Sequence, residues 1–162
     1  MENRCQPPEA VGADRLANAV AAYDELRATC LIVDAGTAAT IDAVSAGGPA
    51  FLGGSILPGI GLAAHALAKG TALLPSLAVR ELGPAIATST TAAITSGVAR
   101  GLAGAVDRLV SDMATELGGC EHVILTGGDA DRLAGLCNTP MALRPLLTLR
   151  GLALAWLARD GD

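Results

Sequence analysis

The chain has 162 residues, of which 51% are hydrophobic and 2% aromatic, and its formal net charge is −5. This length is sufficient for one domain with a buried core, which must consist mainly of Leu, Val, Ile and Ala. The negative charge and the single lysine, Lys69, argue against nucleic acid or an anionic membrane as a partner.

The cysteines and the N-terminus point to a cytoplasmic location. Cys5, Cys30, Cys120 and Cys137 form no C-x-x-C pair, so we expect reduced thiols rather than disulfides or metal ligands. The first residues contain no apolar run, and no signal peptide is expected. Every long apolar stretch is interrupted by Gly, Pro or charge, so no membrane span is expected either.

The first half of the chain predicts one helix followed by a three-strand meander. Residues 1–10 are expected to be irregular, and residues 13–28 place Leu16, Val20 and Tyr23 on one face of a helix. Three short apolar runs then predict strands. They cover residues 30–33, 40–44 and 51–56.

A short helix at 62–68 and a loop to about residue 87 should precede one long helix over residues 90–117. Apolar residues at intervals of three and four predict its buried face. They are Ile94, Val98, Leu102, Ala105, Leu109, Met113 and Leu117. Gly97, Gly101 and Gly104 interrupt this helix, although each costs roughly 1 kcal/mol there. They predict that another backbone or a ligand passes close.

The last part of the chain alternates between strands and helices. We expect a strand at 122–125, a helix at 129–136, an extended segment at 146–149 and a helix at 151–159. Together with the meander, this alternation predicts an α/β fold with a mixed sheet and helices packed on it.

The most informative segment runs from Leu31 to Asp42. Its apolar residues end in Asp34-Ala-Gly-Thr37, and an extended pattern resumes at Thr40. A buried strand therefore ends in a glycine turn that carries hydroxyls and a carboxylate, which can meet a phosphate or a metal ion. An ordinary hairpin would use the same residues, so this segment alone leaves both interpretations open.

Further motifs flank this segment in a fixed order. They are Gly12-Ala13-Asp14-Arg15, the run from Phe51 to Gly59, the run from Ser89 to Gly97, and Leu125-Thr126-Gly127-Gly128. Together they resemble the type III pantothenate kinases, which belong to the actin-like sugar-kinase superfamily. The resemblance extends from about Gly12 to about Ala155.

The resemblance implies an actin-like (ribonuclease H-like) C-terminal domain over residues 29–162. Residues 1–28 would be the remnant and crossover helix of an N-terminal domain. The implied reaction is the ATP-dependent phosphorylation of pantothenate to 4′-phosphopantothenate in coenzyme A biosynthesis. The implied assembly is a homodimer with the substrate near the subunit interface.

In the family, the first motif binds pantothenate, which implies substrate contacts for Gly12, Ala13, Asp14 and Arg15. Asp14 would be the catalytic base that faces the 4′-hydroxyl, mainly orienting it for attack because positioning dominates phosphoryl transfer. Arg15 would hold the pantothenate carboxylate. Taken alone, Asp14 would more often be a helix cap than a catalytic residue, and Arg15 could be part of a surface ion pair.

Thr90 matches a further substrate-binding residue of the family. It lies seven residues before Gly97, as the family pattern requires. The family usually has Asn before this Thr, whereas this chain has Ser89. Since Ser also caps helices, a plain helix start is the alternative.

The resemblance also assigns the nucleotide and its ions. Asp34 would bind a monovalent cation, K⁺ or NH₄⁺, and Thr37, assisted by Thr40, would contact the phosphates of ATP, which carries Mg²⁺. Gly127 and Gly128 would face the adenosine. The alternatives are hydrogen bonds within the turn for Asp34, sheet contacts for the threonines and an ordinary strand-to-helix turn for the glycines.

One family feature has no counterpart before Gly12, namely a strand followed by an Asp-x-Gly-Asn-Thr loop that holds the ATP phosphates. This difference would fit a fragment, a split subunit or a degenerate relative. We therefore expect weak kinase activity from the chain alone. The alternative function is a non-catalytic regulatory or binding protein of the same fold.

Overall fold

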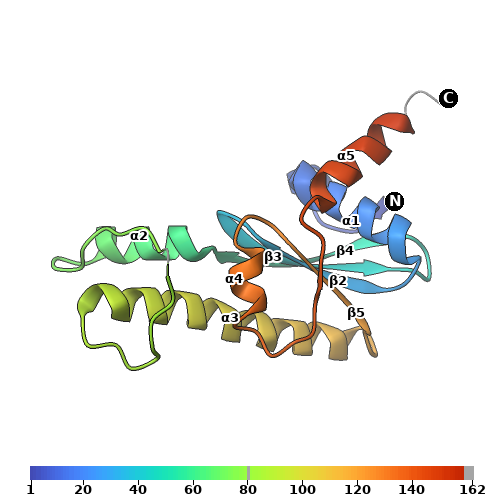
Figure 1. Cartoon of the computed structure of the whole chain (residues 1–162). Helices are drawn as coiled ribbons and strands as arrows, with labels where there is room; N and C mark the ends of the chain where they lie inside the picture. Colours follow the sequence, from blue (N-terminus) through green and yellow to red (C-terminus); the bar gives the residue numbers. More distant parts are fainter. Residues whose placement is uncertain (80, 159–162) are drawn as a thin grey trace.

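The computed structural model describes residues 1–79 and 81–158, in which a mixed β-sheet separates two layers of helices (Figure 1). The strands are β1 Glu2–Asn3, β2 Cys30–Ala35, β3 Ala38–Ser45, β4 Ala50–Pro58, β5 His122–Thr126 and β6 Ala142–Leu143. The helices are the 3₁₀ helix η1 Pro8–Ala10, α1 Ala13–Leu26, α2 Ile60–Gly70, α3 Thr90–Glu116, α4 Ala130–Ala134 and α5 Leu147–Leu157. Helices α1 and α5 lie on one face of the sheet, and α3 and α4 lie on the other.

The sheet has the strand order β1-β4-β3-β2-β5-β6. Strands β2, β3 and β4 form an antiparallel meander, whereas β5 pairs with β2 and β1 pairs with β4 in parallel. The carboxyl ends of β2, β4 and β5 therefore meet at one edge of the sheet, together with the turn between β2 and β3. This topology confirms the predicted actin-like α/β class.

Strand β2 is buried on both faces, which explains its continuous apolar run. Leu31 and Val33 belong to the core under α3, whereas Cys30 and Ile32 belong to the core under α1. Because side chains alternate along a strand, Asp34 shares the face of Ile32. The same rule places Thr40 and Asp42 of β3 on that face, since they pair with Asp34 and Ile32.

Two segments of the predicted secondary structure are wrong. Residues 1–10 contain β1, because Glu2 and Asn3 add a short strand beside Ala50 and Phe51, and they also contain η1. Residues 146–149 are not extended, because α5 begins at Leu147, and the extended segment is β6 instead. A two-residue strand depends on its partner strand, and a short apolar run is compatible with either structure.

Helix α3 is as long as predicted, but its buried face is rotated from the expected one. Val98, Leu109 and Met113 lie half-buried at the border of that face. The fully buried residues are Ile94, Thr95, Ser96, Ala99, Leu102, Ala103, Val106 and Val110. Small residues at the centre allow the helix to approach the sheet closely. Gly97, Gly101 and Gly104 are exposed, and a Cβ there would meet no described atom within 4 Å.

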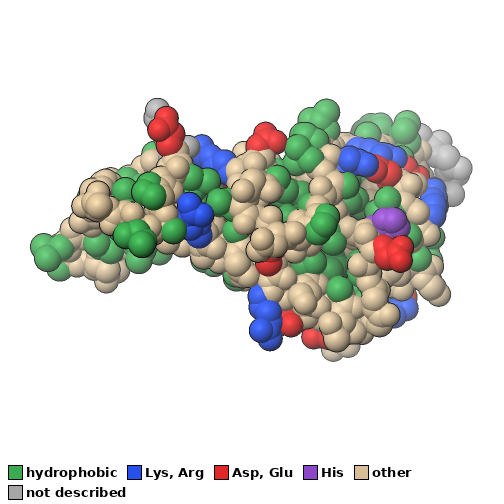
Figure 2. Space-filling model, turned by 60° about the horizontal axis from the view of Figure 1, so that its bottom comes forward, with side chains coloured by type: hydrophobic (Ala, Val, Ile, Leu, Met, Phe, Trp, Pro, Cys, Tyr) green, Lys and Arg blue, Asp and Glu red, His purple; other side chains and the backbone are tan. Residues whose placement is uncertain are grey.

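Helix α2 and the loop that follows it project beyond the edge of the sheet, beside the first turns of α3 (Figure 1). Hydrophobic side chains are exposed over this arm (Figure 2). They include Leu62, Leu67, Leu73, Leu82 and Ile86. In the part of the chain that the structure describes, no helix combines the length and the apolar character needed to cross a membrane.

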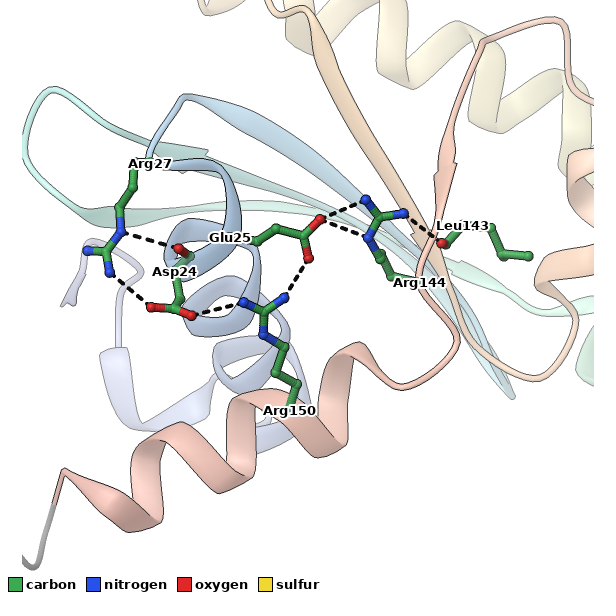
Figure 3. Close-up of polar contacts among 6 residues, drawn as sticks. All are labelled: Asp24, Glu25, Arg27, Leu143, Arg144 and Arg150. Atoms are coloured by element: carbon green, nitrogen blue, oxygen red, sulfur yellow. Dashed lines mark hydrogen bonds and ion pairs between the residues drawn. The ribbon is translucent and has the colours of Figure 1, made fainter.

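Helix α5 lies directly against α1. A Cβ on Gly151 would collide with the carbonyl of Ala17, so the two backbones touch at this point. At the other end of α1, charged residues connect this helix to α5 and to the segment just before α5 (Figure 3). Glu25 accepts hydrogen bonds from Arg144 at 2.8 Å and from Arg150 at 2.6 Å, and Arg150 also reaches Asp24 at 3.0 Å.

These contacts make the packing of α1 on α5 dependent on pH. The hydrogen bond from Arg144 lowers the pKa of Glu25 below its ordinary value of 4.5. A carboxyl group whose pKa is lowered by folding stabilises the folded state at pH values above the pKa that it has in the unfolded chain. That contribution is lost as the pH falls through the folded pKa.

Replacing Glu25 with Gln should therefore lower the free energy of unfolding by about 1 kcal/mol at pH 7. The difference from the parent should shrink as the pH falls below 4.5, because Glu25 then becomes protonated in the parent as well. Urea unfolding at pH 7 and at a pH well below 4.5 measures this effect, with Glu9→Gln on η1 as the control. An equal difference at the two pH values would contradict the prediction.

Candidate active site

A buried ion pair connects the start of α1 to the sheet. Arg15 donates from Nε to Asp42 Oδ1 at 3.0 Å and to Oδ2 at 3.2 Å, and its Nη2 also bonds Oδ1. The Asp42 side chain is 0% exposed and that of Arg15 is 14% exposed. The hydrogen bond to Asp42 raises the pKa of Arg15. Burial raises the pKa of Asp42, and the bonds from Arg15 oppose that rise.

The surroundings of this ion pair hold both partners in place. The Arg15 guanidinium lies over the ring of Phe51, 5.4 Å from its centre, and Thr40 donates a hydrogen bond of 3.1 Å to Asp42 Oδ2. Gly54 is the β4 partner of Asp42, and a Cβ there would lie 2.6 Å from Asp42 Oδ1. Glycine is therefore required beside this carboxylate.

A second polar link lies one helical turn further along α1. Asn18, which is fully buried, donates from Nδ2 to Asp34 Oδ2 at 2.8 Å. Its Oδ1 accepts a 2.7 Å hydrogen bond from Thr148 of α5. Burial raises the pKa of Asp34, although the bond from Asn18 acts in the opposite direction. Asp34 is thus connected to α5 through α1.

Glycine turns surround Asp34 at the edge of the sheet. Gly127 has a φ of +99°, and a Cβ there would lie 2.6 Å from both Asp34 Oδ1 and the Ala35 carbonyl. A Cβ on Gly36 would lie 3.6 Å from the same carboxylate oxygen. Asp34 Oδ1 therefore faces one glycine in each of two turns. A carboxylate oxygen among backbone groups suits a hard monovalent cation.

Asp14 occupies the exposed first turn of α1. The helix cap is Gly12, not Asp14, and a Cβ on Gly12 would lie 2.5 Å from Asp14 Oδ1. The same oxygen accepts a 2.9 Å hydrogen bond from the backbone N–H of Arg15. Asp14 thus satisfies a free amide of the first turn, as a capping residue would, while its carboxylate stays open to solvent.

The remaining predicted residues lie in three separate places, namely the turn between β2 and β3, the turn before α4 and the start of α3. Thr37 is exposed in the turn between β2 and β3, and its carbonyl accepts a 3.0 Å hydrogen bond from Gly59. Gly128 is exposed at the start of the turn into α4. Thr90 begins α3 on the projecting arm, where Ser89 caps the helix by accepting from Ala92. The structure brings Arg15, Asp34, Thr40 and Gly127 together on the α1 side of the sheet, and Thr90 lies on the other side.

Sequence reasoning missed Asn18, Asp42 and Thr148 as members of this network. Asn18 carried a usable signal, because it is a polar residue three positions after Arg15 on the face of α1 that carries small apolar residues. Asp42 follows Thr40 at the spacing that places both on one face of a strand. Thr148 gave no signal, since only the packing of α5 brings it to Asn18. In the described part of the chain, no group of three His, Cys, Asp or Glu residues could hold a metal ion.

Comparison with known proteins gives one consistent result. The family model of type III pantothenate kinases matches residues 1–112. A type III pantothenate kinase of Rubrobacter xylanophilus is 46% identical over 96% of this chain and 61% of its own length. That of Desulfosudis oleivorans is 45% identical over 91% of this chain and 58% of its own length.

The chain belongs to the type III pantothenate kinase family. It spans about three fifths of the length of these two relatives. A conserved Campylobacter jejuni protein assigned to the Baf family of transcriptional activators is similar in structure, with a TM-score of 0.66 and 26% identity over 95% of this chain and 67% of that one. The Alp12 filament structure, with a TM-score of 0.56 and 11% identity, shares the fold over 91% of this chain.

The contribution of the buried ion pair to the stability of this chain can be tested by substitution. Arg15→Met keeps much of the side-chain packing but leaves the Asp42 carboxylate buried without its cation. The free energy of unfolding should fall by about 3–5 kcal/mol. Adding Asp42→Asn should recover part of the loss, because the uncompensated charge is then removed.

Urea unfolding of the three proteins measures these differences. Arg108→Met is the matched control, since it removes an ion pair with Asp112 whose side chains are 77% and 47% exposed. That control should change stability little. A loss for Arg15→Met no larger than that of the control would contradict the role assigned to Asp42.

Proposed function

We propose that this chain carries the pantothenate-binding and part of the nucleotide-binding machinery of a type III pantothenate kinase. The proposed reaction is the transfer of the γ-phosphoryl group of ATP to the 4′-hydroxyl of pantothenate, in the cytoplasm. The observation that carries the proposal is the exposed Asp14 carboxylate, held by its own first turn beside the buried Arg15–Asp42 pair. The family membership supplies the reaction.

In this proposal, α1 binds the substrate. Asp14 accepts a hydrogen bond from the 4′-hydroxyl and aligns its oxygen for attack on the phosphorus atom. Gly12 and Ala13, both exposed, leave the backbone at the start of α1 accessible to the substrate. The Arg15 side chain, which is 14% exposed, attracts the pantothenate carboxylate, and its hydrogen bonds to Asp42 fix the position of the guanidinium.

The nucleotide would lie across the turns at the edge of the sheet. Thr37, which is exposed, is the phosphate contact, and Thr40 assists from below through its bond to Asp42. Gly127 and Gly128 leave space for the adenosine. Asp34 would hold K⁺ or NH₄⁺, and Mg²⁺ bound to ATP would neutralise charge on the transferring phosphoryl group.

The active form is proposed to be a homodimer. Gly97, Gly101 and Gly104 leave α3 open to solvent, and the neighbouring arm exposes large apolar side chains. A second copy covering this surface would remove both from water. Thr90 begins the same helix and would then lie near the dimer interface, where it could contribute to substrate binding.

A non-catalytic binding or regulatory role is the second candidate. One observation favours it, namely the structural similarity to the C. jejuni protein that is described as a Baf family transcriptional activator, with a TM-score of 0.66 and 26% identity. Activity in the presence of the remaining part of a relative distinguishes the two candidates. A regulatory protein would bind ligands but would not phosphorylate pantothenate, either alone or together with that remaining part.

The Asp14 prediction is tested in two proteins. One is the chain alone, from which we expect little turnover, and the other is a chimera with the part of the R. xylanophilus kinase that this chain does not match. Asp14→Asn keeps the shape and the capping ability, but it should lower the chimera's rate about 100-fold with little change in melting temperature. Mass spectrometry of 4′-phosphopantothenate gives the rate.

Asp131→Asn, in the exposed first turn of α4, is the matched control and should leave the rate unchanged. If Asp14→Asn lowered the rate and the melting temperature together, the role of Asp14 would be that of a helix-capping residue. A chimera that phosphorylates no pantothenate would favour the regulatory role.

The dimer is tested at the centre of the glycine stripe. Gly101→Leu places a large side chain where a partner helix would approach, so the molar mass should shift from dimer to monomer. Light scattering coupled to size exclusion measures the mass. If the variant stays as dimeric as the parent, the stripe is not the interface.

A further inference from the structure

Asn18 is a buried polar residue to which the proposed reaction gives no direct role. It lies in the middle of α1, is 0% exposed and is hydrogen-bonded at both ends of its amide. Nδ2 donates to Asp34 Oδ2 at 2.8 Å, and Oδ1 accepts from the Thr148 hydroxyl at 2.7 Å. Asn18 therefore joins the end of β2 to the first turn of α5 through the interior of the molecule.

The bond from Thr148 decides which way the Asn18 amide points. An asparagine amide donates from its nitrogen and accepts at its oxygen, whereas an ionised carboxylate only accepts. The amide must therefore turn its nitrogen toward Asp34, and its buried oxygen then needs a donor. The Thr148 hydroxyl is that donor. Without it, the amide oxygen would be left unpaired, and a rotated amide would set that oxygen against the carboxylate.

The position of Thr148 is set by a contact between two backbones. Thr148 and Gly151 are three residues apart on α5, so they are neighbours on the helix surface. A Cβ on Gly151 would collide with the carbonyl of Ala17, the residue just before Asn18. The close packing of α5 on α1 thus carries the hydroxyl to the amide, and the short threonine side chain leaves it little freedom to move away.

The two carboxylate oxygens of Asp34 have different surroundings. Oδ2 accepts the hydrogen bond from Asn18. Oδ1 faces Gly127, where a Cβ would lie 2.6 Å away, and Gly36, where a Cβ would lie 3.6 Å away. A carboxylate that is held at one oxygen cannot rotate freely, so the direction of its other oxygen is fixed as well.

We propose that Asn18, fixed by Thr148, is a positioning residue that holds Asp34 Oδ1 toward the two glycines, where it binds a monovalent cation. This inference rests on the cation-binding role proposed for Asp34. It adds that α5 contributes to the cation site, although α5 supplies no ligand to it. A bond that only pins α1 to α5 would affect stability, whereas a bond that positions a ligand also sets the affinity for the ion.

Titration of the chain with KCl tests the proposal without turnover, at an ionic strength kept constant with tetramethylammonium chloride. The NMR shifts of the Gly36 and Gly127 backbone amides give the dissociation constant for K⁺. Thr148→Val keeps the shape of the side chain but removes the donor, so it should raise this constant about 10-fold. Thr148→Ser keeps the hydroxyl and should restore the constant of the parent.

Thr139→Val is the matched control. The Thr139 hydroxyl also donates a 2.7 Å hydrogen bond, but to Asp107 of α3 on the other side of the sheet. Its loss should leave the K⁺ constant unchanged. Circular dichroism checks that each variant is folded, and Thr148→Ala replaces Thr148→Val if the latter is not. Equal K⁺ constants for the Thr148 and Thr139 variants would overturn the proposal.

The same titration is made on the chimera described above, together with its rate of 4′-phosphopantothenate formation. If K⁺ shifts the amides of Gly36 and Gly127 in neither protein, the cation role of Asp34 is wrong and this inference falls with it. Product formation by the chimera would still support the proposed reaction in that case. A chimera that forms no product, but whose K⁺ affinity falls in Thr148→Val, would support the positioning role and contradict the kinase reaction.

Discussion

The position of α1 on the sheet depends on the ion pair between Arg15 and Asp42. A carboxylate that is 0% exposed is strongly destabilising unless a cation and further hydrogen bonds compensate it. Arg15 and Thr40 supply that compensation, and Phe51 supports the guanidinium from one side. Only one placement of the first turn of α1 satisfies these contacts, so the exposed Asp14 beside Arg15 is fixed by a pair that lies beneath it.

Helix α1 also connects segments that are far apart in the sequence, namely β2 and α5. Asn18 lies one turn after Arg15 and joins Asp34 of β2 to Thr148 of α5. The contact between Gly151 and the Ala17 carbonyl sets how closely α5 can approach. Among the described residues, no buried polar side-chain atom lacks a hydrogen-bond partner. A fully satisfied network of this kind favours one arrangement of helices and sheet over others.

The sequence predicted the elements whose pattern is local and missed those that depend on a partner. The three-strand meander and the long α3 follow from apolar runs and helical spacing. Strand β1 and the start of α5 do not, because a two-residue strand and a short apolar run acquire their structure from their neighbours. The three motifs that contain Asp14, Asp34 and Gly127 were recognisable in the sequence. Asp42 and Asn18 bond Arg15 and Asp34 of these motifs, and only the fold brings them together.

The candidate residues lie on both sides of the sheet, so one chain does not bring all of them to one place. Arg15, Asp34 and Gly127 gather on the α1 side of the sheet, whereas Thr90 begins α3 on the other side, at the end of the projecting arm. The sheet between them is packed on both faces, so the two groups cannot approach each other within one rigid chain. If both contact one substrate, the second group must come from another copy.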